Sequence, residues 1–221
     1  MWRKFIPEDI KQQYRLRSAK KTYSQQGEDR ILADLGLLKK RGFYVDIGAH
    51  HPLYLSNTRL LYQFGWQGIN IDPLPGMKKI FDRSRSRDIN LEIAVSDRDG
   101  EEDYYIFAGP DNTLNREEAI AKKGLKNSLK VKTRRLAGIL DDYASGKKID
   151  LLNIDVENYE DKILRSNNWQ KYRPGIILVE IRELDLENMD SSPIHLFLKN
   201  LGYKIFAKTL LTAFYQDANI A

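Results

Sequence analysis

The sequence predicts an α/β fold with a doubly wound, mostly parallel sheet and a C-terminal antiparallel hairpin. Short apolar segments alternate with amphipathic segments along most of the chain, which is typical of βαβ units. The first apolar segment ends in Asp46-Ile47-Gly48-Ala49, and the second ends in Ile71-Asp72. A glycine after the first strand and an acid after the second are typical of a nucleotide-binding half-sheet.

The first half of the chain is expected to begin with a helix over 28–40, because its apolar residues share one face and basic residues precede Gly42. Gly65 ends a short helix expected over 57–64. Turn residues at 97–100 separate two further apolar segments. The other elements expected in this half are a helix over 77–83 and strands over 42–47, 68–72, 89–96 and 103–107.

Residues 108–130 interrupt the alternation. They are polar, contain glycine and show weak periodicity apart from a helix expected over 116–123. Long irregular segments in compact domains are usually functional, so we expect a lid or acceptor-binding insertion here. Regular alternation then resumes. It predicts helices over 136–143, 160–164 and 194–201, and strands over 149–155, 175–181, 203–207 and 211–215.

Length and composition predict one main domain. A chain of 221 residues that is 42% apolar can bury a sizeable core. No apolar run approaches the roughly 20 residues of a membrane span, and the N-terminus lacks a signal-peptide apolar region, so we expect a cytoplasmic protein. Cysteine is absent, which excludes disulfides, cysteine zinc sites and thiolate nucleophiles. Catalysis must therefore use carboxylates, histidine, hydroxyls or lysine.

The net charge of +5 is concentrated at the N-terminus. Residues 1–21 contain seven basic and two acidic residues, whereas the remainder has 29 of each. We expect residues 1–22 to form a basic helical extension and 23–221 to form the main domain. The extension suits nucleic acid, an anionic membrane or an acidic partner, and the alternative is an amphipathic helix packed on the domain. A second basic cluster, 122–135, is placed to face an anionic acceptor.

The loop after the first strand excludes two classes of nucleotide. A dinucleotide site needs further glycines so that a pyrophosphate can lie on the helix N-terminus, but Ala49, His50, His51 and Pro52 follow Gly48. No GxxxxGK[ST] segment is present to bind a triphosphate. S-adenosylmethionine has a ribose and a charged amino-acid tail but no phosphate, so it is the adenosine cofactor that fits. The alternative is an ordinary turn with a capping aspartate.

Ordered motifs run through residues 23–216. They are Ser24-Gln25-Gln26-Gly27-Glu28-Asp29, Asp46-Ile47-Gly48-Ala49-His50-His51-Pro52, Ser56-Asn57-Thr58, Gly65-Trp66-x-Gly68-Ile69-Asn70-Ile71-Asp72, Asp88-Ile89-Asn90, Ala94-Val95-Ser96, Ile154-Asp155-Val156-Glu157, Arg173-Pro174 and Ile177-Leu178-Val179-Glu180. Together they closely resemble the FkbM-type methyltransferases. The resemblance implies a class I, Rossmann-like fold and S-adenosylmethionine-dependent O-methylation, often of a sugar or a glycosylated natural product.

The resemblance also implies the cofactor contacts. The methionine part would contact Asp46, Gly48 and Ala49, the ribose would contact Asp72 with Pro73 after it, and the adenine would lie between the Asp88-Ile89 turn and Ala94 to Ser96. One departure concerns the turn after Glu157. The family usually has glycine where this chain has Asn158. Asparagine tolerates a left-handed backbone, so we expect the turn to be retained.

Two further residues have competing interpretations. Glu28 is within reach of the cofactor's ammonium group if its helix approaches the site, and the alternative is an interaction with the helix dipole. Asn57 is a candidate donor to the cofactor, and the alternative is an N-cap of the next helix.

In the insertion, Asn112 and Thr113 are candidate acceptor contacts. Tyr104 is a candidate stacking surface, although aromatic residues in strands usually lie in the core.

The candidate catalytic residues lie after the central strands, because side chains at the carboxyl ends of parallel strands reach the ligand crevice. We expect Asp155 to be the general base or to orient the acceptor hydroxyl. An alternative is a Mg²⁺ ion shared by Asp155 and Glu180. His50 and His51 are rival bases, since histidine titrates near neutral pH.

Two other classes of function compete with a small-molecule or glycan O-methyltransferase. A nucleic-acid methyltransferase would use the basic segments, but the chain lacks an Asn/Asp-Pro-Pro-aromatic motif and a cysteine, so nucleic acid is disfavoured. A non-catalytic interaction module would usually have lost Gly48 or Asp72, and both are present. The acceptor and the oligomeric state are not specified by the sequence.

Overall fold

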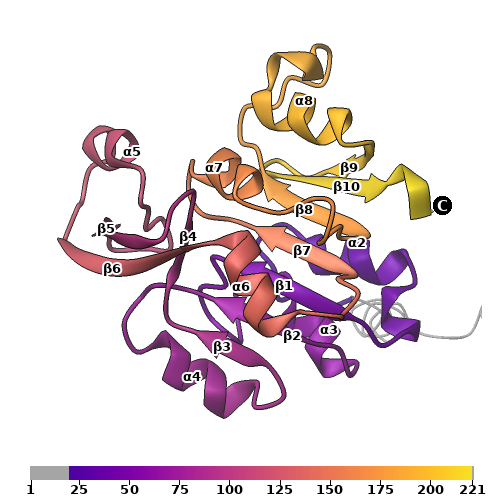
Figure 1. Cartoon of the computed structure of the whole chain (residues 1–221), viewed down its shortest axis with the longest axis horizontal. Helices are drawn as coiled ribbons and strands as arrows, with labels where there is room; N and C mark the ends of the chain where they lie inside the picture. Colours follow the sequence, from indigo (N-terminus) through magenta and orange to yellow (C-terminus); the bar gives the residue numbers. More distant parts are fainter. Residues whose placement is uncertain (1–19, 221) are drawn as a thin grey trace, which may run out of the picture.

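The computed structural model describes residues 20–220, which form an α/β fold (Figure 1). Residues 1–19 of the expected N-terminal extension lie outside the described part. A seven-stranded sheet has the order β3-β2-β1-β7-β8-β10-β9, in which β10 is antiparallel to its neighbours and the other pairs are parallel. The predicted doubly wound sheet with a C-terminal hairpin is confirmed. The strands are β1 (Phe43–Ile47), β2 (Gln67–Ile71), β3 (Ile89–Leu91), β7 (Leu151–Ile154), β8 (Ile176–Glu180), β9 (Tyr203–Lys208) and β10 (Thr212–Asp217).

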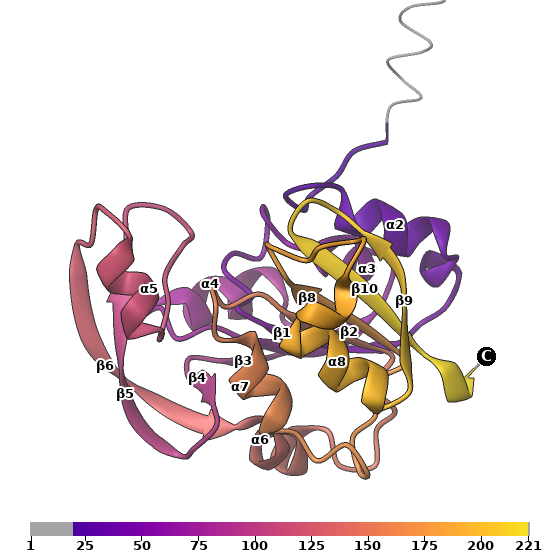
Figure 2. The same ribbon diagram turned by 90° about the horizontal axis from the view of Figure 1, so that it is seen from above.

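Helices cover both faces of this sheet, as a parallel sheet requires (Figure 2). Residues of α6, α7 and α8 pack with Val45 and Ile47 on one face, whereas α2 and α3 pack with Tyr44 on the other. No helix in the described range is long and apolar enough to cross a membrane. The helices are α2 (Glu28–Asp34), α3 (Arg59–Gln63), α4 (Met77–Ser84), α5 (Arg116–Ala121), α6 (Leu136–Tyr143), α7 (Glu160–Arg165) and α8 (Pro193–Asn200), with 3-10 turns η2 (Leu37–Lys39), η3 (Met189–Ser191) and η4 (Ala218–Ile220).

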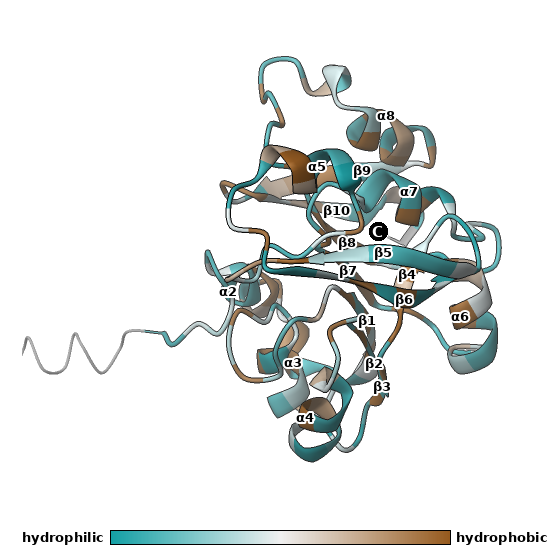
Figure 3. Cartoon of the chain, turned by 90° about the vertical axis from the view of Figure 1, so that its left-hand side faces the viewer, coloured by the Kyte–Doolittle hydropathy of each residue, from teal (hydrophilic) through white to brown (hydrophobic). Residues whose placement is uncertain are grey.

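A second, three-stranded sheet stands beside the first. It has the order β4-β6-β5, with β4 (Ala94–Ser96) parallel and β5 (Gly100–Ile106) antiparallel to β6 (Asn127–Arg135). Figure 3 shows its strands in front of the central sheet, with hydrophilic residues along much of their length. The prediction of one strand over 89–96 is wrong, because the chain leaves the central sheet after Leu91 and joins the second sheet at Ala94. Helix α5 matches the helix expected within 108–130, but the prediction that this segment is otherwise irregular is wrong at its end, since β6 begins at Asn127.

The expected helix over 28–40 is interrupted. Helix α2 ends at Asp34, and the chain re-forms only the short turn η2. The interruption lies at Gly36, whose φ of +80° is in the left-handed region that glycine adopts readily. The backbone therefore changes direction there.

The order of strands places a switch point between β1 and β7. From β1 the chain builds outward through β2 and β3, and from β7 it builds in the opposite direction through β8. In open α/β sheets the ligand crevice lies at the carboxyl ends of the strands on either side of such a point. The site is therefore expected after Ile47 and Ile154.

Candidate active site

A cavity with an empty volume of about 580 Å³, partly open to solvent, lies at this switch point. The carboxyl ends of β1, β2 and β7 form its floor, and the second sheet and the insertion form its outer wall. Residues that line it include Gly48, His50, Asp72, Pro73, Ala94, Tyr104, Asn112, Thr113 and Asp155.

The predicted cofactor residues divide into two groups. Four of them line the cavity, namely Gly48, Asp72, Pro73 and Ala94. The others do not line it and lie in supporting positions, namely Glu28, Asp46, Ala49, Asn57, Asp88, Ile89 and Ser96.

Gly48 is required by the close approach of two strand ends. Its φ is +74°, and a Cβ on Gly48 would lie 1.8 Å from the carbonyl oxygen of Asp155. The N–H groups of Gly48 and Ala49 both donate to the carbonyl of Ile71, at 3.0 and 3.1 Å. The loop after β1 is thus held tightly against both neighbouring strands, and its backbone reaches the cavity.

Asp72 directly follows β2 and lies at the cavity wall. Its two carboxylate oxygens accept hydrogen bonds from the backbone N–H groups of His50 at 2.8 Å and Leu74 at 2.9 Å. Burial raises the pKa of Asp72 to about 6, although these two donors oppose the shift. A carboxylate oxygen can accept more than one hydrogen bond, so Asp72 retains capacity for ribose hydroxyls.

Asp46 and Asn57 brace the loop after β1 from beneath. Asp46 is buried and accepts hydrogen bonds from Thr58 Oγ1 at 2.5 Å and Asn153 Nδ2 at 2.9 Å. Asn57 Nδ2 donates to Asn153 Oδ1 at 2.9 Å. These bonds connect β1, the start of α3 and β7 under the cavity. Ala49 also lies under the loop, packed against α4.

Arg85 is a fully buried cation that the sequence did not point to. It is 1% exposed and lies next to the carboxylates of Asp46 and Asp88, whose burial it partly compensates. It ties the segment 52–58 to the sheet beneath the cavity. Its guanidinium donates, at 2.6 to 3.1 Å, to oxygen atoms of Pro52, Ser56, Thr58 and Asn70.

Asp88 and Ile89 lie at the amino end of β3, whereas the cavity lies at the carboxyl end. The carboxylate of Asp88 accepts hydrogen bonds from Tyr44 Oη and, at 2.9 Å each, from Gly68 N and Asn70 Nδ2. The structure thus does not bring the Asp88-Ile89 turn to the cavity. The β3–β4 connection at Ile93 lines it instead. Ser96 is beyond Ala94 and donates to Glu102 at 2.6 Å.

Glu28 connects α2 to the C-terminal hairpin. Its carboxylate accepts hydrogen bonds from Gln26 N at 2.8 Å, Thr209 Oγ1 at 3.2 Å and Thr212 Oγ1 at 3.4 Å. These contacts fix the edge strands near the carboxyl end of β8. The side chain of Glu28 does not reach the cavity.

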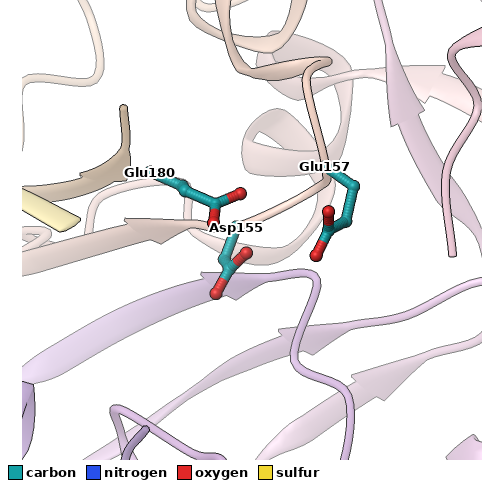
Figure 4. A group of neighbouring side chains, drawn as sticks. All are labelled: Asp155, Glu157 and Glu180. Atoms are coloured by element: carbon teal, nitrogen blue, oxygen red, sulfur yellow. The ribbon is translucent and has the colours of Figure 1, made fainter. Parts of the chain in front are cut away.

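Three carboxylates meet at the carboxyl ends of β7 and β8 (Figure 4). One oxygen each of Asp155, Glu157 and Glu180 lies within 4.8 Å of the other two. The structure thus brings Asp155 and Glu180 together, as expected for adjacent strand ends. Burial, followed by the Glu180 and Glu160 carboxylates, raises the pKa of Asp155 well above its ordinary value. Burial and Glu157 also raise the pKa of Glu180.

Two cations partly neutralise this acidic cluster. Arg182 pairs with Glu157 and, through Nε at 3.0 Å, with Glu180. Lys122 of the insertion lies 2.9 Å from Glu157 and 3.0 Å from Glu118. Sequence reasoning assigned no role to Glu157 or Arg182, although each lies two residues beyond a predicted catalytic carboxylate.

The insertion is anchored on the turn that carries Glu157. Both Glu157 and Asn158 have a left-handed backbone, with φ of 58° and 66°, so the expectation for Asn158 is confirmed. Thr113 Oγ1 donates to the carbonyl of Glu157 at 2.8 Å, and Asn115 Nδ2 donates to that of Asn158 at 2.9 Å. A non-glycine residue in this conformation is stable only when its surroundings hold it. The insertion supplies that support.

The two histidines after β1 differ in position. His50 lines the cavity, and burial lowers its pKa. His51 does not line it, because its ring stacks on Tyr54 at 3.9 Å and its Nδ1 accepts a hydrogen bond from Leu53 N at 3.1 Å. His50 is therefore the better placed of the two rival bases.

Sequence comparison identifies the family. Residues 46–205 match the model of the methyltransferase FkbM domain, which is most of the chain. The chain belongs to the FkbM methyltransferase family. It is therefore an S-adenosylmethionine-dependent methyltransferase. No curated protein matches this FkbM methyltransferase. Among solved structures, a TehB-like SAM-dependent methyltransferase from Corynebacterium glutamicum is 10% identical, with 95% of this chain and 97% of that chain covered and a TM-score of 0.45.

The buried Glu160 should give this FkbM methyltransferase an unusual dependence of stability on pH. Burial raises the pKa of Glu160 to about 7. A carboxyl group with a raised folded-state pKa stabilises the fold below its unfolded-state pKa, and this contribution disappears as the pH rises through about 7. Replacing Glu160 with glutamine, which can still accept the hydrogen bond from Val156, should make the protein up to about 3 kcal/mol more stable than the wild type at pH 8.5 and leave stability almost unchanged near pH 4.5.

Urea unfolding at both pH values measures this difference. Glu187→Gln, at an exposed position, is the matched control and should change stability similarly at both. An equal effect of Glu160→Gln at pH 4.5 and 8.5 would show that Glu160 titrates normally.

Proposed function

We propose that this FkbM methyltransferase methylates a hydroxyl group of a small-molecule or glycan acceptor of the sugar type. The observation that carries the proposal is the position of Asp155. Its carboxylate lines the cavity at the switch point, and no cationic side chain of the described range pairs with it. Burial raises the pKa of Asp155 above that of an ordinary carboxyl group, which makes it a stronger base.

S-adenosylmethionine, when bound, supplies a methyl group made electrophilic by the sulfonium. The acceptor hydroxyl must lose its proton as its oxygen forms the bond to the methyl carbon, while the methyl–sulfur bond breaks and S-adenosylhomocysteine leaves. In the proposed role, a carboxylate oxygen of Asp155 takes that proton. Glu180 then favours the proton on Asp155, because two adjacent carboxylates resist being ionised together. The remaining contribution of the chain is alignment of the two reactants.

The residues proposed to hold the cofactor are those of the cavity. The backbone at Gly48 provides close approach for the methionine part, and Asp72 accepts hydrogen bonds from the ribose hydroxyls. Pro73 and Ala94 provide apolar contacts for the adenine. Asp46, Asn57 and Arg85 support this cradle from beneath without lining it.

The shared Mg²⁺ ion has weaker support than a direct role for Asp155. Mg²⁺ requires oxygen ligands at about 2.1 Å in octahedral geometry. The three carboxylates could supply part of that set, but Arg182 and Lys122 already neutralise Glu157 and Glu180. Activity that EDTA abolishes and Mg²⁺ restores would favour the metal; activity retained in EDTA would favour Asp155 acting directly.

The nucleic-acid alternative is weakened by the pairing of the second basic cluster. Four of its seven cations form ion pairs with acids elsewhere in the described chain, so the segment is not a free basic surface. The pairs are Lys122 with Glu118 and Glu157, Lys130 with Asp103, Arg134 with Asp142, and Arg135 with Asp99.

The test is methyl transfer from cofactor labelled in its methyl group to a panel of sugars, glycosides, amines and RNA. The proposal expects a labelled methyl ether on a sugar-type acceptor, together with S-adenosylhomocysteine. Labelled RNA or a labelled N-methyl product, without a methyl ether, would contradict it.

A further inference from the structure

A groove with an empty volume of about 1300 Å³, partly open to solvent, lies on the other side of the acidic cluster from the cofactor cavity. It is bordered by the start of α7, the segment after β8, and η3 with the start of α8. The two spaces adjoin at the acidic cluster, since carboxylate oxygens of Asp155 and Glu157, which line the cavity, lie within 4.8 Å of one of Glu180, which lines the groove. An acceptor in this groove would lie next to the proposed base.

The groove is strongly acidic. Five carboxylates line it, and Arg182 is the one cation among its lining residues. Arg182 is also committed to Glu157 and Glu180. The carboxylates are those of Glu118, Glu160, Asp161, Glu180 and Glu183.

Unpartnered oxygen atoms show that this charge is incompletely satisfied. Glu180 is 6% exposed, and its Oε2 is buried without a hydrogen-bond donor among the described residues. Asp161 Oδ1 is likewise buried and lacks a donor there, whereas the other oxygen of Asp161 pairs with Arg165 Nε at 2.8 Å. A buried acceptor without a donor destabilises the fold, and more so when it is charged. Both oxygens belong to residues that line the groove.

A cationic donor would satisfy these groups together. An ammonium group has three N–H donors and a full positive charge, so it can bond to several carboxylates at once. Burial, followed by the Glu180 and Glu157 carboxylates, raises the pKa of Glu160, and a cation held beside it would oppose that shift.

We infer that this groove is the acceptor subsite and that it selects acceptors that carry a protonated amine beside the hydroxyl to be methylated. The inference rests on the proposed function and narrows its acceptor class to amine-bearing sugars. The amine would lie among Glu160, Asp161 and Glu180, and the hydroxyl would face Asp155. Neutral sugars would leave the carboxylates unsatisfied and would bind less well.

The test compares two probes that share a ring and differ in charge. D-glucosamine and N-acetyl-D-glucosamine are titrated into the full chain in EDTA, with and without saturating S-adenosylhomocysteine, and binding is followed by NMR. We expect glucosamine to bind at least tenfold more tightly than its acetylated form, with a preference that decreases as salt is raised. Equal affinity for the two probes would overturn the inference.

Variants that neutralise carboxylates of the groove test whether the preference for glucosamine arises there. Asp161→Asn combined with Glu183→Gln should reduce the preference for glucosamine about tenfold or remove it. The matched control, Glu101→Gln combined with Asp142→Asn, removes the same charge at exposed positions outside the groove and should keep the preference. An equal loss in both double variants would indicate non-specific attraction and overturn the inference. Thermal unfolding confirms that each variant is folded.

The same experiments separate failure of this inference from failure of the proposed function. If S-adenosylhomocysteine binds and a neutral sugar is O-methylated as readily as its amine analogue, the inference is wrong and the proposed function stands. If the cofactor binds but no hydroxyl is methylated in either class, the proposed function is wrong. A preference for glucosamine that is seen without added S-adenosylhomocysteine still supports a cation-selective groove.

Discussion

Replacing Asp155 with asparagine should reduce kcat for O-methylation about 10²–10⁴-fold, the usual contribution of a general base. Asparagine has almost the same shape but cannot accept the proton of the acceptor hydroxyl. The affinity for S-adenosylhomocysteine should be unchanged, because Asp155 acts on the acceptor in the proposed mechanism. Initial rates with saturating cofactor and acceptor measure the effect.

The pH profile provides a second readout of the same residue. The base must be deprotonated to act, and the pKa of Asp155 is raised. In the wild type, kcat/KM should therefore increase with pH well above the range in which an ordinary carboxyl group titrates, and Asp155→Asn should lose this limb. Asp142→Asn, at an exposed position, is the control. If Asp155→Asn retains wild-type kcat and His50→Gln does not, His50 is the base.

Replacing Arg85 with methionine should reduce the free energy of unfolding by about 3–5 kcal/mol, the usual cost of removing one partner of a buried charge network. Methionine fills part of the volume but leaves the buried Asp46 and the half-buried Asp88 without their cation. It also removes the hydrogen bonds that hold segment 52–58. Urea unfolding measures the loss.

Arg87 supplies the matched control for this substitution. It lies two residues away, is exposed, and makes one backbone contact, to the carbonyl of Tyr62 at 2.7 Å. Arg87→Met should cost less than about 1 kcal/mol. Similar losses for the two variants would mean that the Arg85 network contributes little to stability.

The sequence predicts the central sheet because its strands repeat a local pattern. Apolar segments such as 149–155 and 175–181 are buried on both faces and are recognisable without tertiary information. The positions of the acids at strand ends can also be predicted without tertiary information, because the end of a strand fixes the position of the residue that follows it. Asp72 and Asp155, which the sequence locates at strand ends, both line the cavity.

The second sheet was missed because its pairing is not local. Residues 89–96 read as one apolar strand, and only the partner strand β6 determines that Ala94 leaves the central sheet. Strand β6 alternates lysine and arginine with Leu129, Val131 and Thr133, which is a strand pattern, but the segment was interpreted as a basic cluster. Asp88 was placed beside the adenine only by the resemblance to the FkbM family, but it lies at the amino end of β3, away from the cavity.

The supporting groups of the site were missed for a related reason. Arg85 occurs in an arginine-rich segment that reads as a solvated surface, and its burial depends on Asp46 and Asp88 approaching from distant strands. Lys122 reaches Glu157 only because the insertion folds back over the turn. Such charge compensation between distant segments leaves no pattern along the chain.

The binding of the cofactor at the end of β2 is best measured by calorimetric titration of S-adenosylmethionine and S-adenosylhomocysteine into the wild type, Asp72→Ala and Asp72→Asn. The cavity geometry predicts micromolar-range binding to the wild type and a loss of tenfold or more in both variants, with folding verified by thermal unfolding. Binding that is equally tight without the Asp72 carboxylate would contradict the proposed ribose contact. No detectable binding to the folded wild type would contradict the site as a whole.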